Sequence, residues 1–248
     1  MRGSLILLCV LAVAGCVATP PEKSDRQHAV AKIHTELAAS YYERAQLGIA
    51  LDELRKAMQA EPDYAPAYNV RGLVHMGLRE DKEAEEDFLH SLKLDNVSSD
   101  AHNNYGWFLC QRGRERESVK QFLAAVKNPL YATPEKAYMN AGLCSKKAGD
   151  LQDAEEFLQK ALLLQPDMPE ARLGMAELQF AQGDYAAAQS SFKRYAESNG
   201  GGLNAANLWL AVRIARKTGD KNAESSYALR LHSLFPDAPE TRLLEQGQ

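Results

Sequence analysis

The side chains that could carry out chemistry in this chain are its cysteines and histidines. Cys9 lies inside an apolar run near the N-terminus and Cys16 follows that run, whereas Cys110 and Cys144 stand 34 residues apart in the body of the chain. The six histidines are dispersed, and none is followed by a second metal ligand three or four residues later. The chain also lacks a glycine-rich phosphate loop, a Gly-x-Ser-x-Gly motif and a His-Glu-x-x-His motif. We therefore expect no catalytic centre, no metal site and no bound cofactor.

The segment before Cys16 is typical of a secretory signal peptide, with Arg2, a ten-residue apolar run over 5–14 and the small residue Gly15. The run is too short to span a bilayer, which needs about 20 apolar residues. The ending Val-Ala-Gly-Cys16 resembles the lipobox of bacterial lipoproteins. This resemblance implies that residues 1–15 are removed, that a diacylglycerol is attached to the sulfur of Cys16, and that a third acyl chain is attached to its amino group.

An anchor of this kind would hold the chain on a membrane, because two or more acyl chains give stable attachment. Lipoproteins retained in the inner membrane carry Asp after the cysteine, whereas this chain has Val17. We therefore expect the outer membrane, on its periplasmic face, and an ordinary secreted protein is the alternative. Residues 16–30 include Pro20-Pro21 and several polar residues, which predicts a tether between the lipid and the folded body.

The rest of the chain is periodic. Repeating segments start at residues 31, 65, 99, 135, 169 and 205. The first five share a small residue at position 8, as at Gly106, and an aromatic or leucine side chain at position 24, as at Phe122. A small residue on one helix leaves room for a large one on its partner. The pattern resembles the tetratricopeptide repeat (TPR) family.

The TPR resemblance implies an all-α fold, a right-handed solenoid of six helix-turn-helix repeats. The repeats would span 31–64, 65–98, 99–134, 135–168, 169–204 and 205–238, with 239–248 as a C-terminal tail. Repeat six departs from the pattern at Val212 and Glu224, so we expect it to act as a solvated cap. A helical bundle without repeats is the alternative.

The charge of the chain bears on its binding partners, and the spacing of its two later cysteines bears on a disulfide. The net charge of −4 gives no basic excess, so we expect no nucleic-acid partner. The acidic run Glu80–Asp87 is interpreted as a solvated helix face. Cys110 and Cys144 fall on the first helices of adjacent repeats, where either a disulfide or two buried thiols would fit the spacing.

In TPR stacks the first helices line the inner surface, and positions 5, 9 and 12 point into it. Cations appear at these positions in repeat six, as Arg213 and Arg216. A contiguous apolar strip usually marks a partner site, and packing against neighbouring helices is the alternative for each residue. An amphipathic or extended protein segment would fit such a groove. The predicted groove residues are Ala39, Tyr42, Asn69, Leu73, Met76, Asn103, Trp107, Met139, Leu143, Leu173 and Phe180.

The lipobox, the short tether and six TPRs together resemble the type IV pilus biogenesis lipoproteins of the PilF/PilW kind, the pilotins, as do the runs over 50–57 and 103–110. The resemblance implies a non-enzymatic monomer that binds the pilus secretin and promotes its localisation and multimerisation in the outer membrane. Two alternatives remain. One is another outer-membrane TPR adaptor, in barrel assembly or cell-wall synthesis, and the other is a peptidoglycan-acting enzyme.

Overall fold

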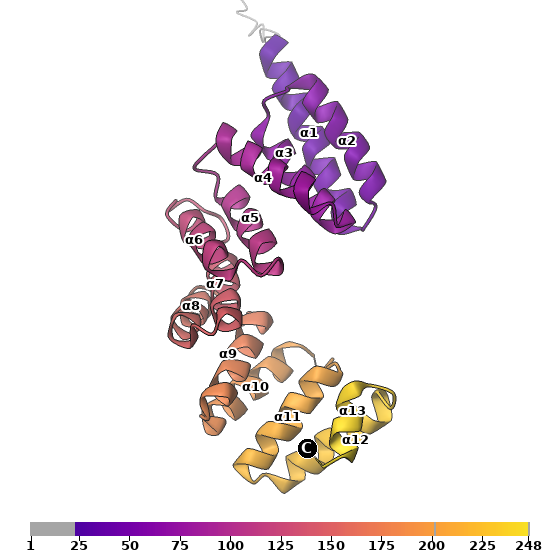
Figure 1. Cartoon of the computed structure of the whole chain (residues 1–248), viewed down its shortest axis with the longest axis vertical. Coiled ribbons are helices and arrows are strands. Elements are labelled where there is room, and N and C mark those ends of the chain that lie inside the picture. Colours follow the sequence, from indigo (N-terminus) through magenta and orange to yellow (C-terminus); the bar gives the residue numbers. More distant parts are fainter. Residues whose placement is uncertain (1–22, 201, 248) are drawn as a thin grey trace, which may run out of the picture.

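The computed structural model describes residues 23–200 and 202–247, which form thirteen α-helices and no strand (Figure 1). The signal peptide over 1–15, the lipidation site Cys16 and the tether up to residue 22 lie outside the described residues. The helices are α1 (Lys23–Glu43), α2 (Leu47–Ala60), α3 (Ala65–Leu78), α4 (Asp81–Leu94), α5 (Ser99–Gln111), α6 (Glu115–Ala125), α7 (Pro134–Ala148), α8 (Leu151–Leu164), α9 (Pro169–Gln182), α10 (Tyr185–Ser198), α11 (Ala205–Thr218), α12 (Lys221–Leu234) and α13 (Pro239–Glu245).

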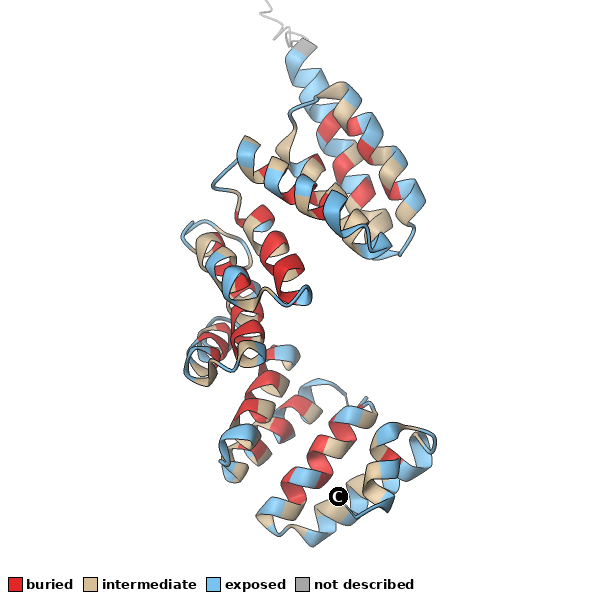
Figure 2. Ribbon diagram, viewed as in Figure 1, coloured by how far each residue is buried: buried red, intermediate tan, exposed pale blue. Residues whose placement is uncertain are grey.

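The first twelve helices pack as six consecutive pairs, from α1 with α2 to α11 with α12, and the pairs stack into an open arc (Figure 1). This arrangement confirms the all-α TPR fold. Buried residues gather where the paired helices face each other, and exposed residues follow their outer faces (Figure 2). The two helices of a pair can approach closely because a small residue on the first faces a large residue on the second. A Cβ atom added at Gly106, for example, would lie only 2.8 Å from the Phe122 ring.

Helix ends follow the turn chemistry of the repeat. Gly183 and Gly219 end their helices with φ of +85° and +76°, a left-handed conformation that glycine adopts without a steric penalty. Asp184 and Asp220 then begin the next helices, since their side chains accept hydrogen bonds from backbone amides three residues later, each at 3.0 Å. In repeats five and six the second helix is thereby turned back onto the first.

The N-terminal boundary of the body differs from the prediction. Helix α1 begins at Lys23, so residues 23–30 are helical and only the remainder of the predicted tether can be a linker. No proline or glycine occurs over residues 22–47, and contacts with the α2–α3 turn hold the added helical turns in place. Nδ1 of His28 lies 2.9 Å from Glu61, and the ring of His28 meets the Tyr64 ring edge-on at 5.2 Å.

The segment predicted as a C-terminal tail contains a helix, because residues 239–245 form α13. Its sequence Pro-Glu-Thr-Arg-Leu over 239–243 matches Pro-Glu-Ala-Arg-Leu over 169–173, the start of repeat five. Helix α13 is therefore the first helix of a seventh, half-length repeat. Thr241 is fully buried, and its hydroxyl donates to the Phe235 carbonyl at 2.6 Å. Helix α13 packs on α11 and α12, so a further helix covers part of repeat six.

Candidate protein-binding groove

The predicted groove residues lie on the first helices of repeats one to five. Ten of the eleven are half-buried, as expected if each packs at its base and offers the rest of its surface to solvent. Asn69 is the exception. With only 7% of its surface exposed, it serves the packing between repeats and is not a groove contact.

The apolar members of the groove rest on separate buried clusters. Leu73 and Met76 pack against the cluster around Phe88 and Phe108, and Trp107 packs against the next cluster along the solenoid. Met139, Leu143, Leu173 and Phe180 are supported in the same way by the clusters of the later repeats. Because a packed core lies beneath each side chain, the strip is largely preformed, which lowers the entropy cost of binding a partner.

Amide side chains join successive first helices along the base of the groove. Asn104 on α5 donates to Asn69 on α3 at 3.2 Å, and Asn140 on α7 donates to Asn103 on α5 at 3.1 Å. Asn140 is 9% exposed, so its partner Asn103 satisfies a polar group that is almost removed from water. These bonds fix the register of repeats two, three and four.

A disulfide links the same central repeats. Cys110 on α5 and Cys144 on α7 are bonded, with their Cα atoms 6.0 Å apart, and both are almost fully buried. Of the two arrangements that the spacing allowed, the structure therefore contains the disulfide. Lys147 on α7 donates to the Cys110 carbonyl at 2.7 Å and pairs with Glu115 at 3.0 Å. The middle of the groove is thus held by covalent and polar bonds between repeats three and four.

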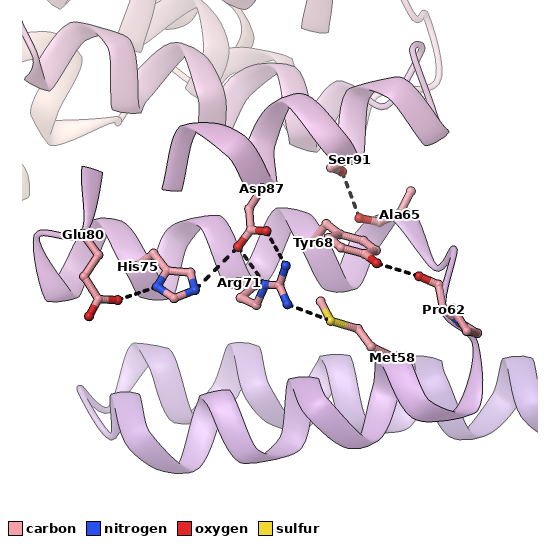
Figure 3. Close-up of polar contacts among 9 residues, drawn as sticks. All are labelled: Met58, Pro62, Ala65, Tyr68, Arg71, His75, Glu80, Asp87 and Ser91. Carbon is pink, nitrogen blue, oxygen red and sulfur yellow. Dashed lines mark hydrogen bonds and ion pairs between the residues drawn. The ribbon is translucent and has the colours of Figure 1, made fainter. Parts of the chain in front are cut away.

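A partly buried ion pair ties repeat two together and contacts repeat one (Figure 3). Arg71 on α3 donates to both oxygens of Asp87 on α4, at 2.8 and 2.6 Å, and a third nitrogen lies 3.1 Å from the sulfur of Met58 on α2. His75 bridges Glu80 at 2.5 Å and Asp87 at 3.7 Å. The hydrogen bonds that Arg71 donates to Asp87 raise the pKa of the Arg71 guanidinium. This cluster serves helix packing, since its charges satisfy one another.

The acidic run Glu80–Asp87 is mostly exposed, as the sequence suggested, but three of its members also make specific contacts. Besides the buried Asp87, two of its members reach the following repeat: Asp81 accepts from Arg112 at 2.7 Å, and Glu85 accepts from Arg114 at 2.6 Å. Glu85 also accepts from the Tyr105 hydroxyl, and burial followed by this bond raises the pKa of Tyr105 to about 12. The run therefore links repeats two and three.

No other kind of site emerges from the described part of the chain. Within residues 23–200 and 202–247, no three metal-binding side chains gather closely enough to hold an ion. None of the thirteen helices has the length and apolar character that a membrane crossing requires. One groove residue was missed by the sequence reasoning, because Glu240 lies on α13 and lines the C-terminal end of the groove. The recurring Pro-Glu-x-Arg-Leu motif could have revealed it.

Comparison with known proteins agrees with this architecture. Tetratricopeptide repeat models match residues 65–97 and 146–212. The type IV pilus assembly protein PilF of Pseudomonas aeruginosa is 30% identical over 97% of this chain and 96% of its own length. The solved structure of Pseudomonas aeruginosa PilF superposes with a TM-score of 0.83 at 28% identity, over 90% of this chain and all of PilF. The crystal structure of PilW, described as a widely conserved type IV pilus biogenesis factor, gives a TM-score of 0.80 at 32% identity, over 87% of this chain and 98% of PilW.

Proposed function

Since the chain belongs to the PilF/PilW family of type IV pilus biogenesis factors, we propose that it is the pilotin of its pilus system. In this role it binds the pilus secretin, escorts it to the outer membrane and promotes its assembly into a multimer. Its place is the cell envelope, on the periplasmic face of the outer membrane. Acyl chains on Cys16 supply the anchor, and the protein acts as a scaffold without catalysis.

The observation that carries this proposal is a preformed apolar strip on a rigid solenoid. Leu73, Trp107 and Leu143 each keep part of their surface in solvent while a packed core supports them from below. Strips of this kind on an exposed face usually mark a protein partner. The amide ladder and the Cys110–Cys144 disulfide hold repeats two to four in one arrangement. A segment that enters the groove therefore meets a surface that needs little reorganisation.

The proposed mechanism couples the groove to the anchor. Only six residues separate Cys16 from the start of α1 at Lys23, and at about 3.3 Å per extended residue this linker spans at most about 25 Å. The groove therefore stays near the membrane surface. Confining the scaffold and a membrane-bound secretin to one surface raises their effective concentration, so a modest affinity of the groove is sufficient.

A pull-down from solubilised outer membrane tests the groove directly. Leu73→Glu places a charge in the strip, whereas Leu163→Glu places the same charge on α8 at a side chain that is already 81% exposed. We expect the first variant to lose secretin capture and the second to retain it, with circular dichroism showing that both are folded. Equal capture by the two variants would exclude the groove as the secretin-binding surface.

The two alternative functions predict other outcomes, one in the pull-down and one in a separate assay on cell wall. An adaptor of barrel assembly or cell-wall synthesis would capture components of those machines in place of the secretin. A peptidoglycan-acting enzyme would release fragments from purified cell wall. The TPR scaffold and the pilus biogenesis relatives favour the protein-interaction role.

A further inference from the structure

The C-terminal end of the groove is built differently from the rest. Successive first helices pack on one another from α1 to α9, and α13 packs on α11, whereas α9 and α11 do not make a comparable contact. The connection from α10 to α11 is two residues longer than in a 34-residue repeat, and its glycines allow a wide turn before Asn204 caps α11. The first helices of repeats five and six are therefore spread apart on the inner side.

A hollow of about 530 Å³ opens between these helices and α13. Its walls carry two half-buried aromatic rings, Phe180 on α9 and Trp209 on α11. Three charged side chains line it as well, namely Glu177 on α9, Arg213 on α11 and Glu240 on α13. The volume is in the range of sites that hold a few side chains or a small ligand.

The three charges are not equivalent. Glu177 is neutralised by an ion pair with Lys146 on α7. Arg213 is exposed, forms no ion pair with any residue of the described ranges, and lies over the face of the Phe180 ring at 4.4 Å. Glu240 is half-buried and likewise has no ion-pair partner among residues 23–200 and 202–247. Among the described residues, the hollow thus presents one cation and one anion without an ion-pair partner, beside two aromatic rings.

We propose that this hollow binds a short segment of a partner protein in which an acidic residue, an apolar residue and a basic residue follow one another. The carboxylate pairs with Arg213, the apolar side chain packs between Phe180 and Trp209, and the cation faces Glu240. This inference rests on the proposed function, because it names the chemistry of the segment held at one end of the groove.

Charge complementarity selects this occupant. A guanidinium is planar and binds a carboxylate through two parallel hydrogen bonds, and stacking on Phe180 already holds the Arg213 plane in position. An apolar side chain alone would leave both charges unpaired, and a segment with two carboxylates would meet repulsion from Glu240. Opposite charges at the two ends also fix the direction in which the segment runs.

The test uses the full-length chain in detergent micelles and three fluorescein-labelled, amidated peptides with the cores Glu-Phe-Lys, Gln-Phe-Lys and Glu-Gly-Lys. We expect anisotropy titrations to show binding of Glu-Phe-Lys and about tenfold or greater weakening for each of the other two. Arg213→Gln should weaken Glu-Phe-Lys by a similar factor and should no longer distinguish it from Gln-Phe-Lys. The control is Arg55→Gln on α2, which removes an arginine whose side chain is 65% exposed and should leave all affinities unchanged.

A second readout locates the peptide. With Trp107→Phe, Trp209 becomes the sole tryptophan, and its emission should change on addition of Glu-Phe-Lys. Three results would each overturn the proposal. The first is equal affinity for Glu-Phe-Lys and Gln-Phe-Lys, and the second is no detectable binding of Glu-Phe-Lys. The third is a loss of affinity in Arg55→Gln that is as large as the loss in Arg213→Gln. If one of these results is found and the Arg213→Gln variant still captures the secretin, only the binding role of the hollow is rejected. The proposed function then stands.

Discussion

The disulfide between Cys110 and Cys144 makes a quantitative prediction about the stability of the central repeats. Reduction breaks only this covalent bond and adds one hydrogen to each sulfur, so it perturbs the link without changing any other side chain. The two cysteines are 34 residues apart in the sequence. The loop-closure relation for a loop of this length gives an entropy loss in the unfolded chain worth about 3.8 kcal/mol at 25 °C. This value is an upper limit, because a reduced unfolded chain keeps some residual structure.

The loss should be local, because each TPR contacts only its neighbours and a solenoid need not unfold in one step. We therefore expect reduction to lower the urea midpoint of the transition that melts repeats three and four, with a smaller effect on the terminal repeats. Far-UV circular dichroism follows the whole solenoid, and hydrogen exchange followed by proteolysis resolves the helices. The control is the double variant Cys110→Ala with Cys144→Ala, whose unfolding should not respond to reductant.

Non-reducing tryptic mapping checks the premise. Cleavage after lysine and arginine gives peptide 94–112, which contains Cys110, and peptide 137–146, which contains Cys144. We expect these two peptides to appear as one linked species that separates on reduction. Two separate peptides with free thiols would refute the disulfide. A linked species whose reduction changes stability by less than about 1 kcal/mol would refute the loop-entropy reasoning.

Three further predictions concern packing and charge. Gly142→Ala should lower the free energy of unfolding by about 1–2 kcal/mol in a urea titration, because the new Cβ would lie 2.7 Å from a Leu158 side-chain atom. This loss should exceed the gain from the better helix propensity of alanine. The control Gly48→Ala meets nothing within 4 Å and should be neutral or slightly stabilising. Asp87→Asn should cost about 1–3 kcal/mol in thermal or urea unfolding, because it leaves the Arg71 guanidinium without its buried counter-charge, and an unchanged midpoint would contradict that role. Hydrogen bonds from neighbouring side chains lower the pKa of Glu53. Its contribution to folding stability is therefore present above the ordinary carboxyl pKa of 4.5 and is lost as the pH falls below that value. Glu53→Gln should accordingly flatten the fall in the urea midpoint between about pH 5 and pH 3.

The sequence predicts the repeats well because their signal is local and recurs. A small residue such as Gly106 and a large one such as Phe122 sit on the two helices of one repeat, so the packing rule is visible in a window of 34 residues. Helix α13 shares only the first-helix motif, so it escapes a search that requires a whole period. Its motif at 239–243 nonetheless copies that at 169–173.

Features that depend on the angle between repeats could not be predicted in the same way. The spacing of Cys110 and Cys144 places them on neighbouring helices, but only the rotation of α7 against α5 decides whether the sulfur atoms meet. Asp81 looks solvated within its own helix, and its partner Arg112 belongs to the next repeat. The hollow beside Arg213 arises from the separation of α9 and α11, which no single repeat encodes.

The amount of secretin multimer in the outer membrane tests the central claim most directly. The comparison uses three strains: a deletion strain, the same strain with the wild-type gene restored, and the same strain with the Cys16→Ala gene. Secretin multimers are quantified in the separated inner and outer membranes of each strain. We predict multimers in the outer membrane with the wild-type gene, a loss of multimers without it, and mislocalised or reduced multimers with Cys16→Ala. Normal multimers in the outer membrane of the deletion strain would contradict the pilotin role.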